Sequence, residues 1–428
     1  MKGFFLTLLQ WKLTLLAKRV LARHKPVIVG VAGSVGKTSA VQAIALALAK
    51  DYRVGQTLRS YNQELGVPLS ILREETGYRS LWRWFAILWR GFRLAYGSSS
   101  TAYPNLLVLE LGADKVGDLD RLLTWIHPMV GVLTAATVEH VEFFGSIQAA
   151  VEEEQKIVTR LAATATAVIN ADDPNVEAAA AKATGRIIRF SQQKPADVFM
   201  TDVVILGTTA QDVQGITAKV SVAGSTLPIV IRDTLGRHSL TAVAAAFGVA
   251  HALGVNLATA GEQLRHYQPP AGRMRIIKGL KSTVIIDDTY NSSPAAAVAA
   301  LDTLYELRTS GRKYAVLGDM RELGSVSDSE HQKIGKYTVG KADVLVTMGE
   351  QAKHIATAAV GAGMSQDVVF RFDKPDRVGN FLQDRLKPGD LILVKASQGT
   401  RCEKVVKEIM AEPQRAAELL TRQYRPWV

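Results

Sequence analysis

Cysteine is almost absent from this chain of 428 residues, and a single Cys402 excludes an internal disulfide. A chain without disulfides suits a reducing compartment, so we expect a cytoplasmic protein. No uninterrupted apolar run reaches the roughly 18 residues that a membrane-spanning helix needs. The apolar residues near the N-terminus are interrupted by Gln10 and Lys12, and no small-residue cleavage site follows them, which argues against a secretory signal.

Long runs of lysine and arginine are also missing, although the formal net charge is +11. Neither a zinc-ligand spacing nor an RNA-binding signature is found, so we expect no nucleic-acid partner. The basic balance then leaves two kinds of anionic partner, a membrane surface and a phosphorylated substrate.

The composition is that of a globular protein, with 47% apolar and 21% charged residues, and the length predicts two or three domains. Continuous apolar segments at 26–33, 105–113, 129–137 and 165–173 alternate with helical patterns. Such buried strands predict a parallel sheet covered on both faces. Residues 198–233 instead alternate in polarity and carry turn signals, which predicts an antiparallel patch.

A second alternating unit follows a break near 267–273, where two prolines and a glycine interrupt the pattern. Its expected strands are STVIIDDTY, KYAVLGDM, ADVLVTMG and DLILVKAS. The predicted fold is therefore α/β, with a P-loop central domain over 26–266 and a Rossmann-like C-terminal domain over 267–428. Residues 1–25 are expected to form a separate basic amphipathic helix.

Two stretches, 1–25 and 78–96, are basic and apolar at helical spacing. In the second stretch Leu81, Phe85, Leu88 and Phe92 fall on one face, and Arg79, Arg83, Arg90 and Arg93 fall roughly opposite. Tryptophan and arginine together suit the bilayer interface, so both stretches predict peripheral contact with the inner face of the membrane. The alternative for each is a helix packed on its own domain or on a partner protein, with its arginines extended to solvent.

GVAGSVGKTSA, residues 30–40, lies between a predicted strand and a predicted helix. Backbone N–H groups and the helix dipole at such a turn attract phosphate. We expect Lys37 to reach the β- and γ-phosphates of a nucleotide and Thr38 to bind Mg²⁺. The usual first glycine of the motif is replaced by Val31, so the match is to a shorter form. The expected nucleotide-binding residues of this loop are Gly33, Ser34, Gly36, Lys37, Thr38 and Ser39.

Two further residues follow predicted strands, where open parallel sheets place their sites. Glu110 ends the second strand and is a candidate Mg²⁺ ligand, since Mg²⁺ prefers oxygen ligands. His140 follows the third strand and is a candidate for the same site. The alternative for both is a structural role inside the domain.

These segments together resemble the Mur ligase family, the ATP-dependent amino-acid ligases of peptidoglycan precursor synthesis. The resemblance extends from about residue 26 to about residue 410, in family order. Beside the short P-loop it rests on YNQELGVPLSIL, LELGADKVGDL, EHVEFFGS, VINADDPNV, GRHSL, AGRMR, IIDDTYNSSP, VLGDMRELG and VKASQGTR. Several of these motifs point to the branch of the family that uses D-alanyl-D-alanine.

The resemblance implies a reaction in which a substrate carboxylate attacks the γ-phosphate of ATP and forms an acyl phosphate. An amine, D-alanyl-D-alanine or one like it, then displaces phosphate and forms an amide. It further implies that Lys37, Thr38, Glu110 and His140 act with Mg²⁺, and that Arg273, Asp288 and Asn291 contact the nucleotide. Lys395, Ser397 and Arg401 match the motif that meets the incoming amine, their alternative being a basic surface loop.

Three departures from the family pattern change these expectations. The P-loop begins after about 25 residues, where the family usually carries a domain that grips UDP, so the acceptor is expected to be either UDP-muramoyl-peptide-like or lipid-linked. The helix that follows GRHSL has Ser239 and Ala242 where the family often has asparagine, so adenine contacts are expected to differ.

The third departure concerns a lysine that the family carbamylates with CO₂ to bind a second Mg²⁺. Glu154 stands at that position by counting from FGS, and we expect its carboxylate to replace the carbamate as a catalytic and metal-binding group. Two alternatives remain open: a solvated acidic helix face, and a shifted register in which Lys156 is the family lysine.

Two other functions are compatible with the sequence. One is a ligase of the same family for another acid and amine, as in folate- or cyanophycin-like polymers. The other is a non-catalytic, membrane-associated nucleotide-binding subunit, against which the intact Lys37, Thr38, Glu110 and His140 argue.

Overall fold

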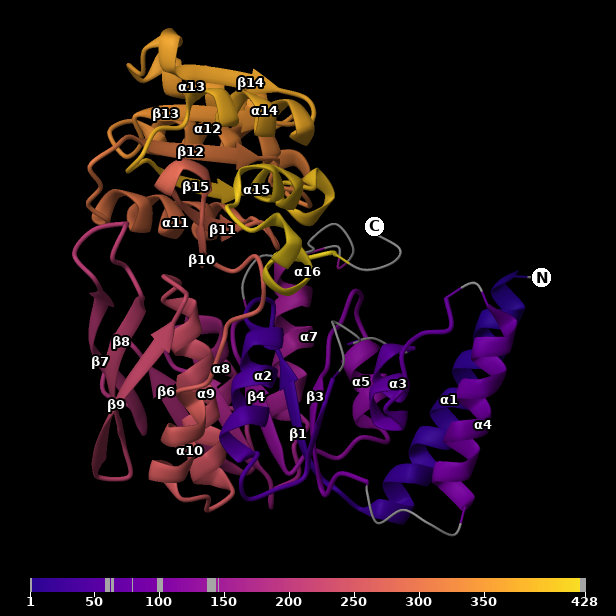
Figure 1. The fold of residues 1–428 in the computed structure, drawn as a ribbon. Helices are drawn as coiled ribbons and strands as arrows, with labels where there is room; N and C mark the ends of the chain where they lie inside the picture. Colours follow the sequence, from indigo (N-terminus) through magenta and orange to yellow (C-terminus); the bar gives the residue numbers. More distant parts are fainter. Residues whose placement is uncertain are drawn as a thin grey trace. The chain divides into compact units, whose positions relative to one another are not determined.

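The computed structural model describes residues 2–57, 62, 65–78, 80–97, 103–136, 144 and 146–423. The chain divides into two compact units (Figure 1). The first comprises 1–202, 218–229 and 238–267, and the second comprises 203–217, 230–237 and 268–428. The antiparallel segment after residue 198 is thus shared between the two units.

A mostly parallel nine-stranded sheet, in the order β2-β3-β1-β4-β5-β6-β7-β8-β9, forms the centre of the first unit. Every pair from β2 to β7 is parallel. The strands are β1 (Val27–Ala32), β2 (Val54–Gln56), β3 (Leu106–Glu110), β4 (Val130–Leu133), β5 (Thr166–Asn170), β6 (Arg186–Ser191), β7 (Val198–Leu206), β8 (Gly215–Val222) and β9 (Ser225–Arg232). Only Ala223 and Gly224, both at positive φ, separate β8 from β9, so these strands form an antiparallel hairpin inside the predicted antiparallel patch.

Helices cover this sheet because its strands are buried on both faces. They are α1 (Lys2–His24), α2 (Lys37–Leu48), α3 (Gly66–Leu72), α4 (Leu81–Tyr96), α5 (Asp118–Leu123), α7 (Ile147–Thr159), α8 (Pro174–Ala180), α9 (His238–Ala252) and α10 (Leu257–Leu264). Helix α9 is alanine-rich and buried almost throughout. Gly248 permits its close approach to the sheet, since a Cβ there would lie 2.6 Å from Cγ1 of Val168.

Both predicted basic helices form, and α1 packs beside α4 and on α3 (Figure 1). Helix α1 buries the stripe of Leu9, Leu13, Ala17 and Val20, whereas α4 buries Trp84, Ile87, Gly91 and Ala95. The face predicted from 81, 85, 88 and 92 is not the packed one, because Leu81, Phe85 and Phe92 are exposed. Among the described helices, none is long and apolar enough to cross a membrane.

The second unit contains a six-stranded sheet in the order β10-β11-β15-β12-β13-β14. Among the described strands of this sheet, only β10 is antiparallel to its neighbour. The strands are β10 (Arg275–Lys278), β11 (Val284–Asp288), β12 (Lys313–Gly318), β13 (Val344–Met348), β14 (Val369–Phe372) and β15 (Leu391–Lys395). The four central strands were predicted, and the two edge strands, each four residues long, were not.

Neighbouring residues of one strand enter separate cores, as Ile285 and Ile286 of β11 do, so this sheet too is covered on both faces. The helices of this unit are α11 (Pro294–Glu306), α12 (Ser327–Thr338), α13 (Ala352–Gly361), α14 (Pro375–Arg385), α15 (Glu403–Ile409) and α16 (Ala416–Leu419). The fold class predicted from the sequence, a mostly parallel P-loop domain with an antiparallel patch and a second α/β domain, is confirmed.

A candidate nucleotide-binding site

The P-loop connects β1 to α2 at the carboxyl end of the parallel sheet. Strand β1 has β3 on one side and β4 on the other, which is the switch point where such sheets place ligands. Gly33 and Gly36 have φ values of 131° and 87°, a region that favours glycine. A Cβ on Gly33 would lie 2.4 Å from Oγ1 of Thr134, so the loop is also fitted tightly against the end of β4.

The first turn of α2 presents the chemistry predicted for a phosphate cradle. No side chain caps this helix at Gly36, which leaves its N-terminal N–H groups and dipole available to an anion. The Lys37 ammonium donates to the carbonyl oxygens of Gly33 and Ser34, the latter at 3.2 Å. Both partners are neutral, so these bonds hold the cation at the loop without neutralising its charge.

Glu110 lies against Thr38, as the sequence predicts for two ligands of one cation. The Thr38 hydroxyl donates to Oε2 of Glu110 across 2.9 Å, and Nδ2 of Asn62 donates to Oε1 across 2.9 Å. Glu110 is only 2% exposed. Two hydrogen bonds therefore fix its carboxylate in place. The carboxylate oxygens are ligands of the kind that Mg²⁺ prefers.

Glu154 reaches the same loop from α7. Its Oε2 accepts a hydrogen bond of 2.8 Å from the backbone N–H of Gly33, and the side chain is 7% exposed. The alternative of a solvated acidic face therefore fails for Glu154. The description as a solvated acidic face applies instead to Glu152, which is exposed on the same helix.

The neighbouring Glu153 and Lys156 form a separate structural cluster. Glu153 accepts from the backbone N–H groups of Gly117 and Leu119, at 2.9 and 2.8 Å, and so fixes the start of α5. Lys156 lies 2.6 Å from Glu153 and 2.5 Å from Asp120. Burial lowers the pKa of Lys156, but hydrogen bonds to Asp120 and Glu153 outweigh this and raise the pKa above its ordinary value.

Some predicted residues of this unit are less informative. Ser39 is buried in α2, and its hydroxyl has no hydrogen-bond partner among the described residues. Its backbone carbonyl accepts from the Tyr267 hydroxyl at 3.3 Å. His140, the remaining candidate for the metal, lies outside the described residues. The described part of the chain contains no cluster of three or more acidic, histidine or cysteine side chains that suits a metal ion.

In the second unit, the predicted residues gather where β11 and β15 end side by side. Asp288 and Lys395 are register partners, and their side chains form an ion pair of 2.6 Å, with Lys395 only 2% exposed. Lys395 also donates to the carbonyl of Asn291 at 3.1 Å. The pair therefore joins a predicted nucleotide contact to a predicted amine contact and fixes the loop between β11 and α11.

Ser397 and Arg401 continue this cluster. The Ser397 hydroxyl accepts from the backbone N–H of Arg321 at 3.0 Å and donates to the carbonyl of Ser292 at 3.3 Å. The Arg401 side chain is 25% exposed and pairs with Glu403 at 2.5 Å. Arg273 lies beside this cluster. Its guanidinium is 4.2 Å from the centre of the Tyr290 ring, and the N–H of the next residue, Met274, donates to Asp288 at 3.2 Å.

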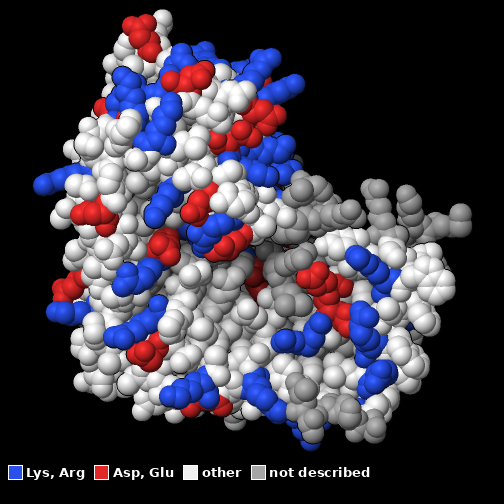
Figure 2. All heavy atoms as spheres, in the orientation of Figure 1, with Lys and Arg blue, Asp and Glu red and all other residues white. Residues whose placement is uncertain are grey.

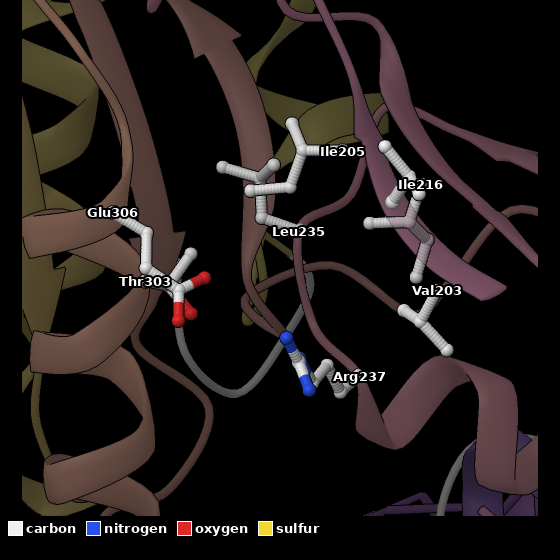
Figure 3. A pocket seen from close by; sticks show the side chains of 8 residues that line it. Val203, Ile205, Ile216, Leu235, Arg237, Thr303 and Glu306 are labelled. Carbon is white, nitrogen blue, oxygen red and sulfur yellow. The ribbon is translucent and has the colours of Figure 1, made fainter. Parts of the chain in front are cut away.

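A separate cavity of about 270 Å³ in the second unit has a mainly apolar lining (Figure 3). Ile205, Leu235 and Ile216 form its walls, and Arg237 and Glu306 carry its charges. None of the residues predicted for nucleotide or amine binding lines it. The cavity therefore adds nothing to the candidate site.

Sequence reasoning missed several residues that support the site. Thr134 directly follows β4 and donates to the carbonyl of Val35 at 2.6 Å. Asp173 accepts from the N–H of Ala136 at 2.8 Å and steadies the segment after β4. Asn62 and Asp173 lie inside the quoted motifs, and Thr134 lies inside the segment 129–137 that was predicted as a strand. The positions of these three residues in the sequence could therefore have marked them as candidates. The residues that they contact could not have been predicted in this way.

Comparison with known proteins agrees with this geometry. The family model described as the Mur ligase middle domain matches residues 94–250, and that of the Mur ligase glutamate ligase domain matches 272–398. The UDP-N-acetylmuramoyl-tripeptide–D-alanyl-D-alanine ligase of Bacillus subtilis is 26% identical over 399 residues, which cover 93% of this chain and 79% of that protein. The enzyme of the same name from Mycobacterium tuberculosis is 28% identical over 406 residues, covering 90% and 73%.

A solved structure agrees with these relatives. The structure of the MurF ligase of Thermotoga maritima in complex with ADP has a TM-score of 0.75 and 25% sequence identity to this chain. The match covers 93% of this chain and 83% of that one.

Proposed function

The chain belongs to the Mur ligase family, and from this we propose that it is an ATP-dependent, ADP-forming ligase of peptidoglycan precursor synthesis. Its amine substrate is D-alanyl-D-alanine or a close analogue, and its acceptor is a muramoyl-peptide carboxylate. The relatives named above support the substrates. The main structural support for this activity is the P-loop, where Thr38, Glu110 and Glu154 lie together.

The proposed reaction forms and breaks bonds in two steps. A carboxylate oxygen of the acceptor attacks the γ-phosphorus of ATP, ADP leaves, and an acyl phosphate results. The amine nitrogen then attacks the carbonyl carbon, a proton is lost, and phosphate leaves with the original carboxylate oxygen. The protein needs to hold the reactants in line and to neutralise charge at the β- and γ-oxygens. The loop N–H groups and Lys37 supply these contacts.

The oxygen donors at the loop fit Mg²⁺. Thr38, Glu110 and Glu154 would hold it, together with His140, and a bound Mg²⁺ would neutralise charge on the phosphate oxygens. Glu110 is already fixed by Thr38 and Asn62, so its carboxylate does not need to be ordered when the cation arrives.

We assign to Glu154 the role that a carbamylated lysine has in the family pattern. A glutamate is an anion without CO₂, and this one lies 2.8 Å from the P-loop backbone. Lys156 is a poor candidate for carbamylation, because its ion pairs keep it protonated and CO₂ reacts only with a neutral amine.

For the second unit, we propose that Arg273, Asp288 and Asn291 contact the nucleotide and that the 395–401 segment meets the amine. Of the three residues predicted in that segment, Arg401 alone is partly exposed, so it is best able to touch a substrate carboxylate. Lys395 and Ser397 are buried and hydrogen-bonded to the 288–292 loop, so they order the loop on which these contacts depend.

The acceptor is proposed to be UDP-linked or lipid-linked, with α1 and α4 in contact with the inner face of the membrane. A phosphate-release assay with both kinds of acceptor and a panel of amines tests the function. Release with D-alanyl-D-alanine, at least about tenfold above release with D-alanine alone, is the expected result. Release only with an unrelated amine would indicate a ligase with another substrate. No release with any acceptor and amine would contradict the proposed catalytic activity.

A further inference from the structure

Helix α4 has three distinct faces rather than two. Trp84, Ile87 and Ala95 are buried against the body of the first unit. A second stripe, three or four residues apart along the helix, is apolar and exposed. Its members and their exposed fractions are Trp82 83%, Phe85 64%, Trp89 55%, Phe92 49% and Tyr96 51%. A soluble helix normally buries its large aromatic residues, so this second stripe needs a partner.

Helix α1 carries a matching exposed stripe. Leu8, Trp11 and Leu15 are 40%, 59% and 50% exposed, and they lie on the side of the helix opposite its buried residues. The chain thus exposes tryptophan, phenylalanine and leucine on two neighbouring helices. We call these two exposed stripes the apolar face of α1 and α4.

The two stripes belong to one surface. Helices α1 and α4 pack against each other and run in the same direction, as two contacts show. Leu16 packs beside Gly91, where an added Cβ would lie 3.2 Å from the leucine Cδ1. One helical turn further on, Arg19 lies 5.3 Å from the centre of the Tyr96 ring. This contact joins the exposed side of α1 directly to the exposed aromatic stripe of α4, where Tyr96 also packs on Phe92 at 4.9 Å.

The charge on these helices has only one sign. Helix α1 contains five Lys or Arg residues and α4 contains three, and neither helix contains an acidic residue. Figure 2 shows Lys and Arg atoms among the white atoms of uncharged residues over this part of the first unit, with a group of acidic atoms beside them. On α4, Arg83 and Arg93 are exposed along one edge of the aromatic stripe. Arg90 on that edge pairs with Glu74 at 2.5 Å.

We infer that this face docks on an anionic phospholipid bilayer. Tryptophan and tyrosine suit the region between headgroups and acyl chains, and arginine at the rim meets lipid phosphate. A second copy of the chain is disfavoured as the occupant, because pairing two such faces would bring like charges together. Helices α1 and α4 would lie in the plane of the interface, with the aromatic rings inserted. The inference deepens the membrane contact proposed above and does not require the ligase activity.

Sedimentation of the full chain with vesicles tests the inference without nucleotide or substrate. The protein should sediment with phosphatidylcholine vesicles that contain phosphatidylglycerol, and less with phosphatidylcholine alone. Trp82→Ser/Trp89→Ser should lower the partition coefficient at least about tenfold. Val116→Ser/Val326→Ser, which changes residues 56% and 50% exposed elsewhere, should leave it unchanged. Arg83→Ser/Arg93→Ser should weaken binding to the anionic vesicles only.

A second readout locates the face itself. Lipids brominated on their acyl chains should quench the tryptophan fluorescence of the parent chain and quench the Trp82→Ser/Trp89→Ser variant much less, while circular dichroism verifies that both are folded. Failure of the parent to bind any vesicle would overturn the inference. So would self-association without lipid that the serine variant abolishes, since the face would then join two copies. Phosphate release with soluble substrates is scored separately, so loss of one activity is distinguishable from loss of the other.

Discussion

Glu154 accepts a hydrogen bond from the backbone N–H of Gly33 across 2.8 Å and thereby places a carboxylate at the phosphate-binding loop. The two residues are 121 positions apart, and the packing of α7 on β1 and β4 brings them together. The contact gives Glu154 two properties that can be separated by mutation, a hydrogen-bond acceptor for the loop and a negative charge for a cation.

Glu154→Gln should separate those two properties. The amide oxygen can still accept from Gly33, so the fold should persist, but the charge is lost. We expect kcat to fall by about 10²–10³ and the Mg²⁺ concentration for half-maximal rate to rise. Glu152→Gln on the exposed side of α7 is the matched control and should behave like the parent. A glutamine variant with full activity at low Mg²⁺ would remove Glu154 from the metal site.

Glu154→Lys offers a sharper test of the carbamate comparison. A lysine there should be almost inactive as an unmodified cation, and added bicarbonate should restore part of the rate by carbamylation. The parent chain should not respond to bicarbonate. A parent rate that depends on bicarbonate would contradict the assignment, and the rate is followed by phosphate release in degassed buffer with and without bicarbonate.

Lys156 should matter for stability rather than for turnover. Its partners Asp120 and Glu153 keep the amine protonated, so mass spectrometry in bicarbonate should find no carbamate on Lys156. Lys156→Gln should cost about 1–2 kcal/mol of unfolding free energy, since the side chain is partly solvated, with kcat within about twofold of the parent. A carbamate on Lys156 would show instead that Lys156 corresponds to the lysine that the family carbamylates.

The buried pair of Asp288 and Lys395 should be strongly coupled. Lys395→Met leaves the Asp288 carboxylate buried without its counter-ion and should cost about 3–5 kcal/mol in denaturant unfolding. Asp288→Asn in the same chain should recover much of that loss, because a neutral amide no longer needs the cation. Lys353→Met, which breaks an exposed pair with Glu350, should cost under about 1 kcal/mol. Equal effects of the two lysine substitutions would refute the coupling.

Asp287 should make the second unit less stable as pH rises toward neutrality. It is fully buried, and burial, reinforced by the charge of Asp288 and opposed by Thr289, raises its pKa from 3.8 to about 7. Between these values the folded state keeps a proton that the unfolded state has lost, so stability falls as pH increases from about 4 to 7. Asp287→Asn should gain up to a few kcal/mol over the parent at pH 8 and little at pH 4. Urea unfolding across this range checks the trend against Asp384→Asn on the surface.

The sequence was sufficient for the parts of the site that are local in the chain. The strand, glycine turn and helix around Lys37 follow one another directly, and Glu110 is marked by its place at a strand end. The parallel sheet and the antiparallel hairpin were likewise predictable from runs of apolar or alternating residues, whereas the short edge strands β10 and β14 carry too few apolar positions to stand out.

Orientation and long-range pairing were not predictable. A shift of one residue along α7 turns a side chain by about 100°, which separates Glu154 at the loop from Glu153 in its cluster with Lys156. Lys395 and Asp288 are 107 positions apart in the sequence. The sequence therefore did not indicate that Lys395 forms a buried ion pair. On α4 the sequence offers two apolar stripes, and only packing against the core of the first unit decides that Trp84, Ile87 and Ala95 are buried.

The central claim, that the γ-phosphoryl group passes to a substrate carboxylate, is tested most directly with an acceptor whose carboxylate carries ¹⁸O at both oxygens. Turnover with ATP and D-alanyl-D-alanine should release phosphate that contains one ¹⁸O atom, because that oxygen leaves the acyl carbon when the amide forms. Lys37→Ala should slow the release by about 10²–10³ without changing the labelling. Phosphate released at the parent rate with no ¹⁸O would mean that water, not a carboxylate, accepts the phosphoryl group, and the account would be wrong.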